Sequence, residues 1–378
     1  MTSTKANESV QALIERQVSE GRQIGVQVCA YKDGKVVVDA VAGQMGPDDP
    51  RPVQRDSLFL SFSMTKGPSA LVLHQLADRG LLDYDAPVAK YWPAFGKNAK
   101  QKITVAQAMS HQAGLHAMPE PFAPEHITDW DAGIRRMEEG VPAYEPGTST
   151  GYHAVTYGWI VGGIVAGVTG RHIKEVIRDN IATPLGIADE FFVGIPDGVE
   201  ERLTTLKLIN FGEGLGLPPD HDFFKAMPAD MWQHFNSMPI RQACLPSGNG
   251  HFTARALARM YAALAGDGSL DGARLVTKDR IPLMNRILTE EVDRVTLAPM
   301  KKGVGFMMGG DSAGVRTAMG PRRTAYGHGG AGSSIAFADP EAGLSIAVTL
   351  NKMQTPLPGE GTTIEICDLI RSELGVAG

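Results

Sequence analysis

The fold of this chain is decided by residues 57–66, which read SLFLSFSMTK. The first six residues alternate polar and apolar side chains, which predicts a short strand or an extended lead-in. Apolar residues then recur at helical spacing as far as Leu81, and Gly80 is a stop signal for the helix. Ser63 is therefore predicted at or near a helix N-terminus, where free backbone N–H groups and the helix dipole favour a nearby oxyanion.

Lys66 gives Ser63 a possible chemical role. The two residues are three positions apart, so their side chains can share one face of the first helical turn. A serine hydroxyl is a poor nucleophile until a neighbour takes its proton, and a desolvated lysine amine is one group that can do so. A serine and a lysine at this spacing occur by chance in most chains of this length, so further motifs have to support the pair.

Length and composition exclude several classes of protein. The 378 residues suffice for one large core or two lobes, and 43% hydrophobic with 21% charged residues is typical of a soluble globular protein. A net charge of −6 gives no basic surface for nucleic acid. The first eight residues are polar and no uncharged apolar run reaches the ~18–20 residues of a membrane span, so we expect no membrane association. Three scattered cysteines without a CxxC pair predict free thiols and a cytoplasmic protein.

The periodicity predicts α/β ends around a helical middle. Asp33-Gly34 predicts a hairpin turn between two strand-like runs within residues 24–42. Residues 195–250 carry many prolines, glycines and aromatic residues with weak periodicity, which indicates an insertion that shapes a pocket wall. The other expected elements are helices over 9–20, much of 63–170, 253–264 and 362–374, and strands over 333–338 and 344–350.

Two further segments support a site around Ser63. Tyr152 follows a Pro-Gly turn and precedes an apolar helix, so its hydroxyl can face a cleft. The run His328-Gly329-Gly330 leads into a predicted strand. Its glycines allow a substrate to approach the backbone closely, and a strand edge can offer an N–H group to an oxyanion.

The order and rough spacing of these motifs resemble the serine β-lactamase and penicillin-binding-protein superfamily, whose marks are S-x-x-K, Y-x-N or S-x-N, and K-T-G. Residues 75–88, 103–115, 266–268 and 327–350 are also similar to that superfamily, and the resemblance extends from about residue 10 to 375. It implies an α+β fold of the β-lactamase/transpeptidase type. An antiparallel sheet flanked by helices would be built from residues 1–62 and 251–378, residues 63–250 would form a mostly helical lobe, and the active site would lie between them.

The resemblance also implies roles for individual residues. Ser63 would be the nucleophile of an acyl-enzyme, Lys66 and Tyr152 would exchange protons with it, and either could be the acylation base. The backbone N–H groups of Ser63 and Ala331 would form the oxyanion hole. Substrate-binding residues would be His153, His328, Gly329 and Gly330.

Two departures from the superfamily pattern bear on the substrate. Ala154 stands where Y-x-N has its asparagine, and His328 stands where K-T-G has its lysine. In the superfamily, the asparagine contacts the side-chain amide of a β-lactam and the lysine favours its carboxylate, so losing both weakens binding of such a substrate. Relaxed motifs of this kind are similar to those of the β-lactamase-like (family VIII) carboxylesterases. The resemblance therefore implies hydrolysis of short-chain acyl esters.

Several alternatives stay open at this stage. They are an acyltransferase of secondary metabolism, a β-lactamase or D-amino-acid peptidase, and a catalytically silent scaffold, although the set of Ser63, Lys66 and Tyr152 argues against silence. We expect a small-molecule ester as the partner, and no feature indicates a homo-oligomer. No metal site is predicted because the chain has no HExxH motif. No cofactor is predicted, since the glycine-rich run 212–216 lacks the strand and helix of a dinucleotide site.

One motif is a decoy. Residues 147–151, GTSTG, satisfy the G-x-S-x-G formula of α/β-hydrolases. That formula requires a buried strand before the serine and a helix after it, and residues 143–146 do not read as a core strand. Ser149 is therefore not expected to be a nucleophile, and His111 is expected to support the loop that follows it.

Overall fold

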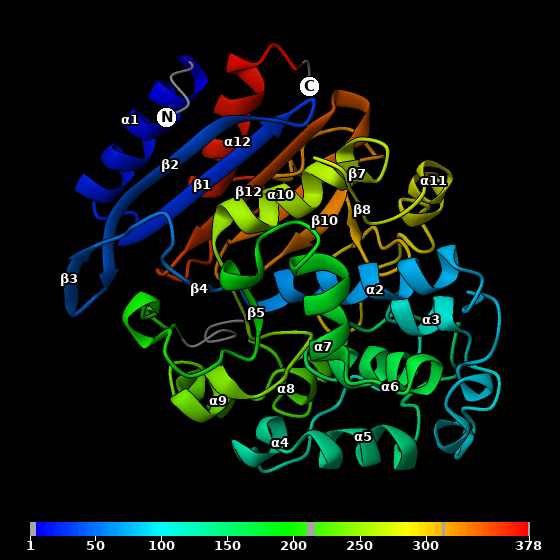
Figure 1. Ribbon diagram of the computed structural model, residues 1–378. Helices are drawn as coiled ribbons and strands as arrows, with labels where there is room; N and C mark the ends of the chain where they lie inside the picture. The colour runs from blue at the N-terminus through cyan, green and yellow to red at the C-terminus, as the bar shows by residue number, and fades with distance from the viewer. Residues whose placement is uncertain (1–4, 210–215, 312–313, 377–378) are drawn as a thin grey trace.

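The computed structural model describes residues 5–209, 216–311 and 314–376 (Figure 1). Its largest feature is a seven-stranded antiparallel sheet with the strand order β3-β2-β1-β12-β11-β10-β9. The strands of this sheet are β1 (Gly25–Lys32), β2 (Lys35–Gly46), β3 (Asp49–Pro52), β9 (Met307–Met308), β10 (Tyr326–Gly329), β11 (Ile335–Asp339) and β12 (Leu344–Leu350). Strands from the two ends of the chain therefore meet where β1 pairs with β12.

Local sequence explains the hairpin that starts this sheet. Asp33 and Gly34 both have positive φ, 50° and 75°, as the primed turn of a two-residue hairpin requires. Every residue of β12 is buried, because helices cover both faces of the sheet (Figure 1). Helices α1 (Lys5–Ser19) and α12 (Thr362–Glu373) lie side by side on one face, and α10 (Ala254–Ala265) packs on the other.

The remaining helices form a layer beyond α10, with α2 (Lys66–Asp78) and α6 (Tyr157–Thr169) packed together at its centre. Residues 66–77 of α2 are all buried, as expected for a helix that is enclosed on all sides. The other helices are α3 (Val105–Met109), α4 (Glu125–Thr128), α5 (Trp130–Glu139), α7 (Ile173–Ile177), α8 (Asp222–Ala226), α9 (Met238–Gln242) and α11 (Ile281–Met284).

A small three-stranded sheet brings together three segments that are far apart in the chain. Its order is β4-β6-β5, with β4 (Phe59–Leu60), β5 (Phe191–Val193) and β6 (Gly250–Phe252). Residues 269–274 form a separate two-stranded hairpin of β7 (Ser269–Leu270) and β8 (Ala273–Arg274). Because β4 leads directly into the Ser63 turn, its pairing with β6 sets the position of that turn.

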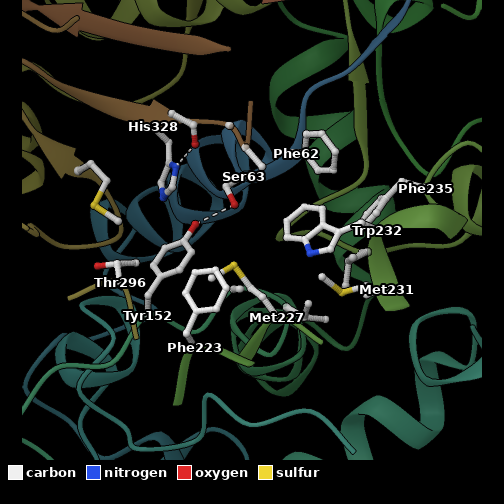
Figure 2. Close-up of a pocket in the computed structure, with 18 of the residues that line it drawn as sticks. Phe62, Ser63, Tyr152, Phe223, Met227, Met231, Trp232, Phe235, Thr296 and His328 are labelled. Atoms are coloured by element: carbon white, nitrogen blue, oxygen red, sulfur yellow. Dashed lines mark hydrogen bonds between the residues drawn. The ribbon is translucent and has the colours of Figure 1, made fainter. Parts of the chain in front are cut away.

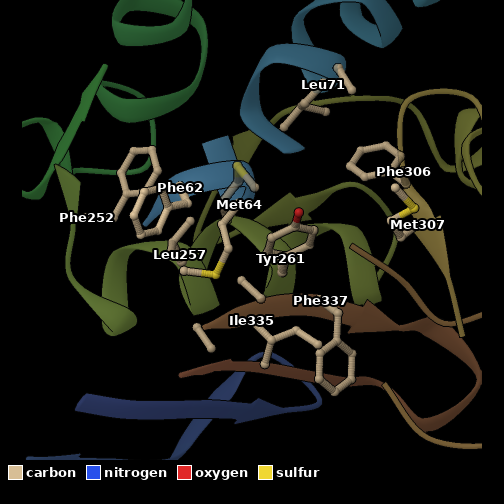
Figure 3. Close-up of a cluster of buried hydrophobic side chains, with 14 of the residues drawn as sticks. Phe62, Met64, Leu71, Phe252, Leu257, Tyr261, Phe306, Met307, Ile335 and Phe337 are labelled. Atoms are coloured by element: carbon tan, nitrogen blue, oxygen red, sulfur yellow. The ribbon is translucent and has the colours of Figure 1, made fainter. Parts of the chain in front are cut away.

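The hydrophobic core includes Phe62 and Met64, the residues on either side of Ser63 (Figure 3). Met64 and Leu71, from the turn and from α2, pack in the same cluster as Tyr261 of α10 and the β11 residues Ile335 and Phe337. None of these five residues is more than 7% exposed. The residue after the candidate nucleophile is therefore anchored in the core, which holds the turn rigidly.

The predicted α+β organisation is confirmed, while the division of the chain at residues 62/63 and 250/251 remains a prediction. The first helix begins at Lys5, four residues before the predicted 9–20. Of the glycine-rich run 212–216, residues 212–215 lie outside the described part of the chain. Within the described part, no helix combines the length and apolarity that crossing a membrane requires.

Candidate active site

Ser63 lies in a tight 3₁₀ turn, η1 (Phe62–Thr65), that runs into α2. Phe62 has φ 43°, a left-handed conformation that is strained for a bulky side chain. The turn is held by hydrogen bonds: Thr65 Oγ1 donates to Phe62 O at 2.5 Å and accepts from Gly250 N at 2.8 Å. Ser61 N–H also donates to Gly250 O at 2.8 Å. Strand β6 thus fixes the backbone on which Ser63 is presented.

Lys66 lies on the first turn of α2, completely buried, with Nζ 3.1 Å from Ser63 Oγ. Its other two partners are backbone carbonyl oxygens, Ala154 O at 2.7 Å and Ser247 O at 2.8 Å. Burial lowers the pKa of the Lys66 amine well below its ordinary value. Burial therefore favours a neutral amine beside the Ser63 hydroxyl.

Tyr152 approaches Ser63 from the other side, and its hydroxyl donates to Ser63 Oγ at 2.7 Å (Figure 2). Burial raises the pKa of this phenol, so it stays protonated at neutral pH. The Tyr152 backbone N–H donates to Asp293 Oδ1 at 3.1 Å. Asp293 in turn forms a buried ion pair with Lys302. The structure thus brings together the three predicted catalytic side chains, and a buried ion pair anchors the backbone of one of them.

The end of strand β10 packs against the Ser63 turn. A Cβ atom on Gly330 would lie 2.6 Å from Ser61 O, so only glycine permits this approach. Ala331 follows and lines the same pocket as Ser63. Its backbone N–H makes no hydrogen bond with other groups in the part of the chain that is described. Both residues line the pocket, and the assignment of the oxyanion hole to the N–H groups of Ser63 and Ala331 stays a prediction.

Gly330→Ala is expected to lower kcat/KM for an ester substrate by about 100-fold, because displacing the Ala331 N–H by an ångström would misplace the oxyanion hole. Gly329→Ala is the comparison variant: Gly329 also lines the pocket, but a Cβ there would meet only Ser334 O at 3.7 Å, an ordinary contact, so its loss should be much smaller. Steady-state kinetics of the two variants checks this prediction. Equal losses in both variants would contradict it.

His328 lines the pocket, as predicted, but as a neutral group. Nδ1 is 2.6 Å from Gly329 O, so it carries the proton and donates to that carbonyl. Burial lowers the pKa of His328 to about 3. Nε2 is left with a lone pair that is buried and has no hydrogen-bond partner among the described residues. Where the superfamily motif has a lysine cation, this site has an uncharged acceptor.

The expectation that His153 binds substrate is wrong. His153 is fully buried and does not line the pocket, because neighbouring side chains of this extended segment face opposite ways and Tyr152 takes the pocket side. Leu115 N–H donates to His153 Nε2 at 2.9 Å, and Nδ1 lies 2.6 Å from Gly151 O. Both ring nitrogens therefore hold the backbone, and burial keeps the pKa of the imidazole well below its ordinary value.

His111 has structural contacts, but with residues 151–153 and not with the loop that directly follows it: its Nδ1 accepts from His153 N–H and its carbonyl from Gly151 N–H, both at 3.0 Å. Ser149 of the GTSTG decoy does not line the pocket. Sequence reasoning missed Ser247, Asp293 and Lys302. No motif marks them, because they act on Lys66 and Tyr152 from positions remote in the chain.

The pocket at Ser63 has a volume of about 830 Å³. None of the described residues that line it carries a formal charge at neutral pH. Its apolar lining includes Phe62, Val155, Ile209, Phe223, Met227, Met231, Trp232, Phe235, Leu245, Met300 and Met307. Most of these side chains come from the 195–250 segment, which therefore forms much of the pocket wall. Such a site favours an uncharged, apolar ligand.

Comparison with known proteins gives consistent results. The sequence model of the family described as Beta-lactamase matches residues 10–366. The chain is 35% identical over 353 residues, 89% of its length and 79% of the relative's, to "Esterase/beta-lactamase LipL" of Mycobacterium tuberculosis. Among solved structures, it resembles a family VIII carboxylesterase with a TM-score of 0.89 and 30% identity over 98% of each chain. It also resembles a penicillin-binding protein homolog from Caulobacter crescentus, with a TM-score of 0.88 and 33% identity over 99% of each chain.

Proposed function

The chain belongs to the beta-lactamase family, and on this premise we propose that it is a serine carboxylesterase that cleaves small, uncharged acyl esters through an acyl-enzyme on Ser63. The observation that carries the proposal is the position of Ser63 Oγ. It lies between Lys66 Nζ at 3.1 Å and the Tyr152 hydroxyl at 2.7 Å, at the wall of a pocket whose described lining is uncharged.

The contacts of Lys66 support it as the acylation base. A neutral amine has two N–H bonds and one lone pair, and two backbone carbonyls, Ala154 O and Ser247 O, accept the two N–H bonds. The lone pair is then directed at the remaining neighbour, the Ser63 hydroxyl. Tyr152 is a poorer candidate, because its raised pKa keeps the phenol protonated. The phenol is suited instead to donate a proton.

The reaction follows from this arrangement. Ser63 Oγ attacks the ester carbonyl while its proton passes to Lys66, and the oxyanion is held by the N–H groups of Ser63 and Ala331. The bond to the alkoxide then breaks, and Tyr152 donates a proton to the leaving oxygen and regains one from Lys66. A water molecule attacks the acyl-enzyme by the reverse proton path and releases the acid. The net change is one ester and one water converted to an acid and an alcohol.

The pocket supports esters over β-lactams. A β-lactam antibiotic carries a carboxylate, and a buried carboxylate needs a cation or several donors. The lone pair on His328 Nε2 and the methyl group of Ala154 supply neither. An ester needs only the nucleophile, the base and the oxyanion hole.

Esters of p-nitrophenol with short acyl chains are expected to exceed nitrocefin in kcat/KM by about a thousandfold, which is about 4 kcal/mol of differential transition-state binding. Parallel steady-state assays on one enzyme preparation measure the ratio. Cephalosporin hydrolysis at a comparable rate would refute the esterase proposal. Ester cleavage that rises sharply with added alcohol, with that alcohol acylated, would favour the acyltransferase.

We further propose that the partner is a small-molecule ester and that the protein acts in the reducing cytoplasm. The three cysteines are free thiols, and Cys29 and Cys367 are buried. Free, scattered cysteines are typical of reducing compartments.

A further inference from the structure

One side of the Ser63 pocket is a cluster of aromatic rings. The ring centroids of Phe62 and Trp232 are 5.8 Å apart, those of Phe62 and Phe235 are 5.0 Å apart, and those of Trp232 and Phe235 are 5.9 Å apart. Met231 joins them in lining the pocket. We call these four residues the aromatic chamber. Figure 2 shows the chamber on the opposite side of Ser63 from Tyr152, His328 and Thr296.

The reaction fixes which part of an ester faces the chamber. The tetrahedral carbon formed on Ser63 Oγ carries three other groups: the oxyanion, the leaving oxygen and the acyl chain. The oxyanion has to face the N–H groups of Ser63 and Ala331. The leaving oxygen has to receive a proton, so it faces the Tyr152 hydroxyl and, beyond it, the side lined by His328 and Thr296. The direction that remains for the acyl chain is the aromatic chamber.

The two sides of the pocket also differ in chemistry. The leaving-group side presents the Tyr152 hydroxyl and the lone pair of His328 Nε2. The hydroxyl of Thr296, on the same side, points away from Ser63 (Figure 2) and donates to Met300 Sδ at 3.1 Å. The chamber presents three ring systems, and each of its aromatic residues is at most 5% exposed. An acetyl group is far too small to contact these rings, and the apolar surface that it leaves unfilled contributes no binding energy. A planar or branched apolar group would contact all three.

We infer that, among the small uncharged esters of the proposed function, the preferred substrates carry an aromatic or branched acyl group, which binds in the aromatic chamber while a more polar alcohol leaves past Tyr152. The inference rests on the proposed esterase function and specifies its substrate class. Because the acyl group stays bonded to Ser63 after the alcohol has left, its contacts with the chamber persist in the acyl-enzyme.

Two p-nitrophenyl esters test the inference, because they share one leaving group and differ only in the acyl chain. We expect kcat/KM for the 3-phenylpropanoate to exceed that for the acetate by about 50-fold, the gain from burying one phenyl ring. Trp232→Ala should reduce this ratio at least about tenfold. The control is Trp130→Ala, which removes a different tryptophan side chain, at the start of α5 and outside the pocket. This variant should leave the ratio unchanged.

Boronic acids provide a test that does not depend on turnover or on the folding of a variant. Boron bonds to a serine Oγ, and its substituent then occupies the position of the acyl chain. With the wild-type enzyme, we expect 2-phenylethylboronic acid to inhibit about 50-fold more tightly than ethylboronic acid. Labelling of Ser63 by a fluorophosphonate, in competition with each compound, gives the two affinities directly.

The outcomes separate the inference from the proposed function. Hydrolysis of both p-nitrophenyl esters with a ratio near one, or equal inhibition by the two boronic acids, would overturn the acyl chamber and leave the esterase in place. A third comparison uses benzyl acetate and ethyl acetate, which differ only in the alcohol. If the ratio of their kcat/KM values exceeded the ratio for the two p-nitrophenyl esters, the inference would also be overturned, because the ring would then bind on the alcohol side. Hydrolysis of neither ester would overturn the esterase proposal and the inference with it.

Discussion

Ser63→Ala is expected to abolish ester turnover, lowering kcat by about 10⁴–10⁶-fold, and to abolish covalent labelling by a fluorophosphonate. The reason is geometric, since Ser63 Oγ is the atom that both Lys66 Nζ and the Tyr152 hydroxyl contact. Alanine keeps the turn, because the hydrogen bonds that hold it come from Thr65 and Ser61. The variant should therefore fold normally, with a thermal midpoint close to that of the wild type.

Ser149→Ala is the matched control for this result. Ser149 belongs to the GTSTG run, and it does not line the pocket. We expect this variant to keep most of its activity and all of its labelling. Labelling that survives Ser63→Ala and disappears in Ser149→Ala would overturn the assignment of the nucleophile.

Lys66→Met is expected to lower kcat by about 10⁴-fold, the upper end of the range for losing a positioned base. Methionine fills the buried space without offering a lone pair to the Ser63 hydroxyl. Lys100→Met is a suitable control, because Lys100 is also fully buried and also donates to backbone carbonyls, those of Glu138 and Gly140, outside the pocket. A loss of activity in both variants, at equal amounts of folded protein, would show that the effect is structural.

Tyr152→Phe is expected to cost about 10²–10³-fold, because the leaving alkoxide loses its proton donor. Combined with Lys66→Met, it should cost much less than the product of the two single effects, since both groups move the same proton. Measured kcat values for the two single variants and the double variant complete the cycle. Fully multiplicative losses would mean that one of the two residues only holds structure.

The pH dependence distinguishes the two candidate bases. The pKa of Lys66 is lowered, so the amine is neutral above that lowered value and active as a base, and kcat/KM should fall only as the pH drops through it. The pKa of Tyr152 is raised above its ordinary value of 10.0, so the phenol remains a proton donor throughout the neutral range. We therefore expect a plateau across neutral pH with an acid limb that disappears in Lys66→Met. A rate that climbs steadily towards pH 10 would instead identify Tyr152 as the base.

The family and the α+β fold were predicted correctly from the sequence. Both can be recognised from short motifs and from the order of these motifs along the chain. Ser63 and Lys66 are brought together by a single helical turn, so their spacing in the chain is already their geometry. The Asp33-Gly34 turn likewise specifies its hairpin through backbone conformations that few residues adopt. The replacement of lysine by His328 was equally visible, because it occupies a motif position.

The protonation states and the pocket could be decided only by the tertiary structure. His153 was wrongly expected to bind substrate because a motif does not say which way the side chain next to Tyr152 faces. The neutral state of Lys66 depends on its burial, and the direction of its lone pair depends on the carbonyls of Ala154 and Ser247, which lie 88 and 181 residues away in the chain. A pKa or a cavity depends on all the groups within a few ångströms, and no local pattern records which distant segments packing brings there. The sequence alone therefore determined the chemistry that Ser63 can perform, while the packing of residues 195–250 over Ser63 decided which substrates can reach it.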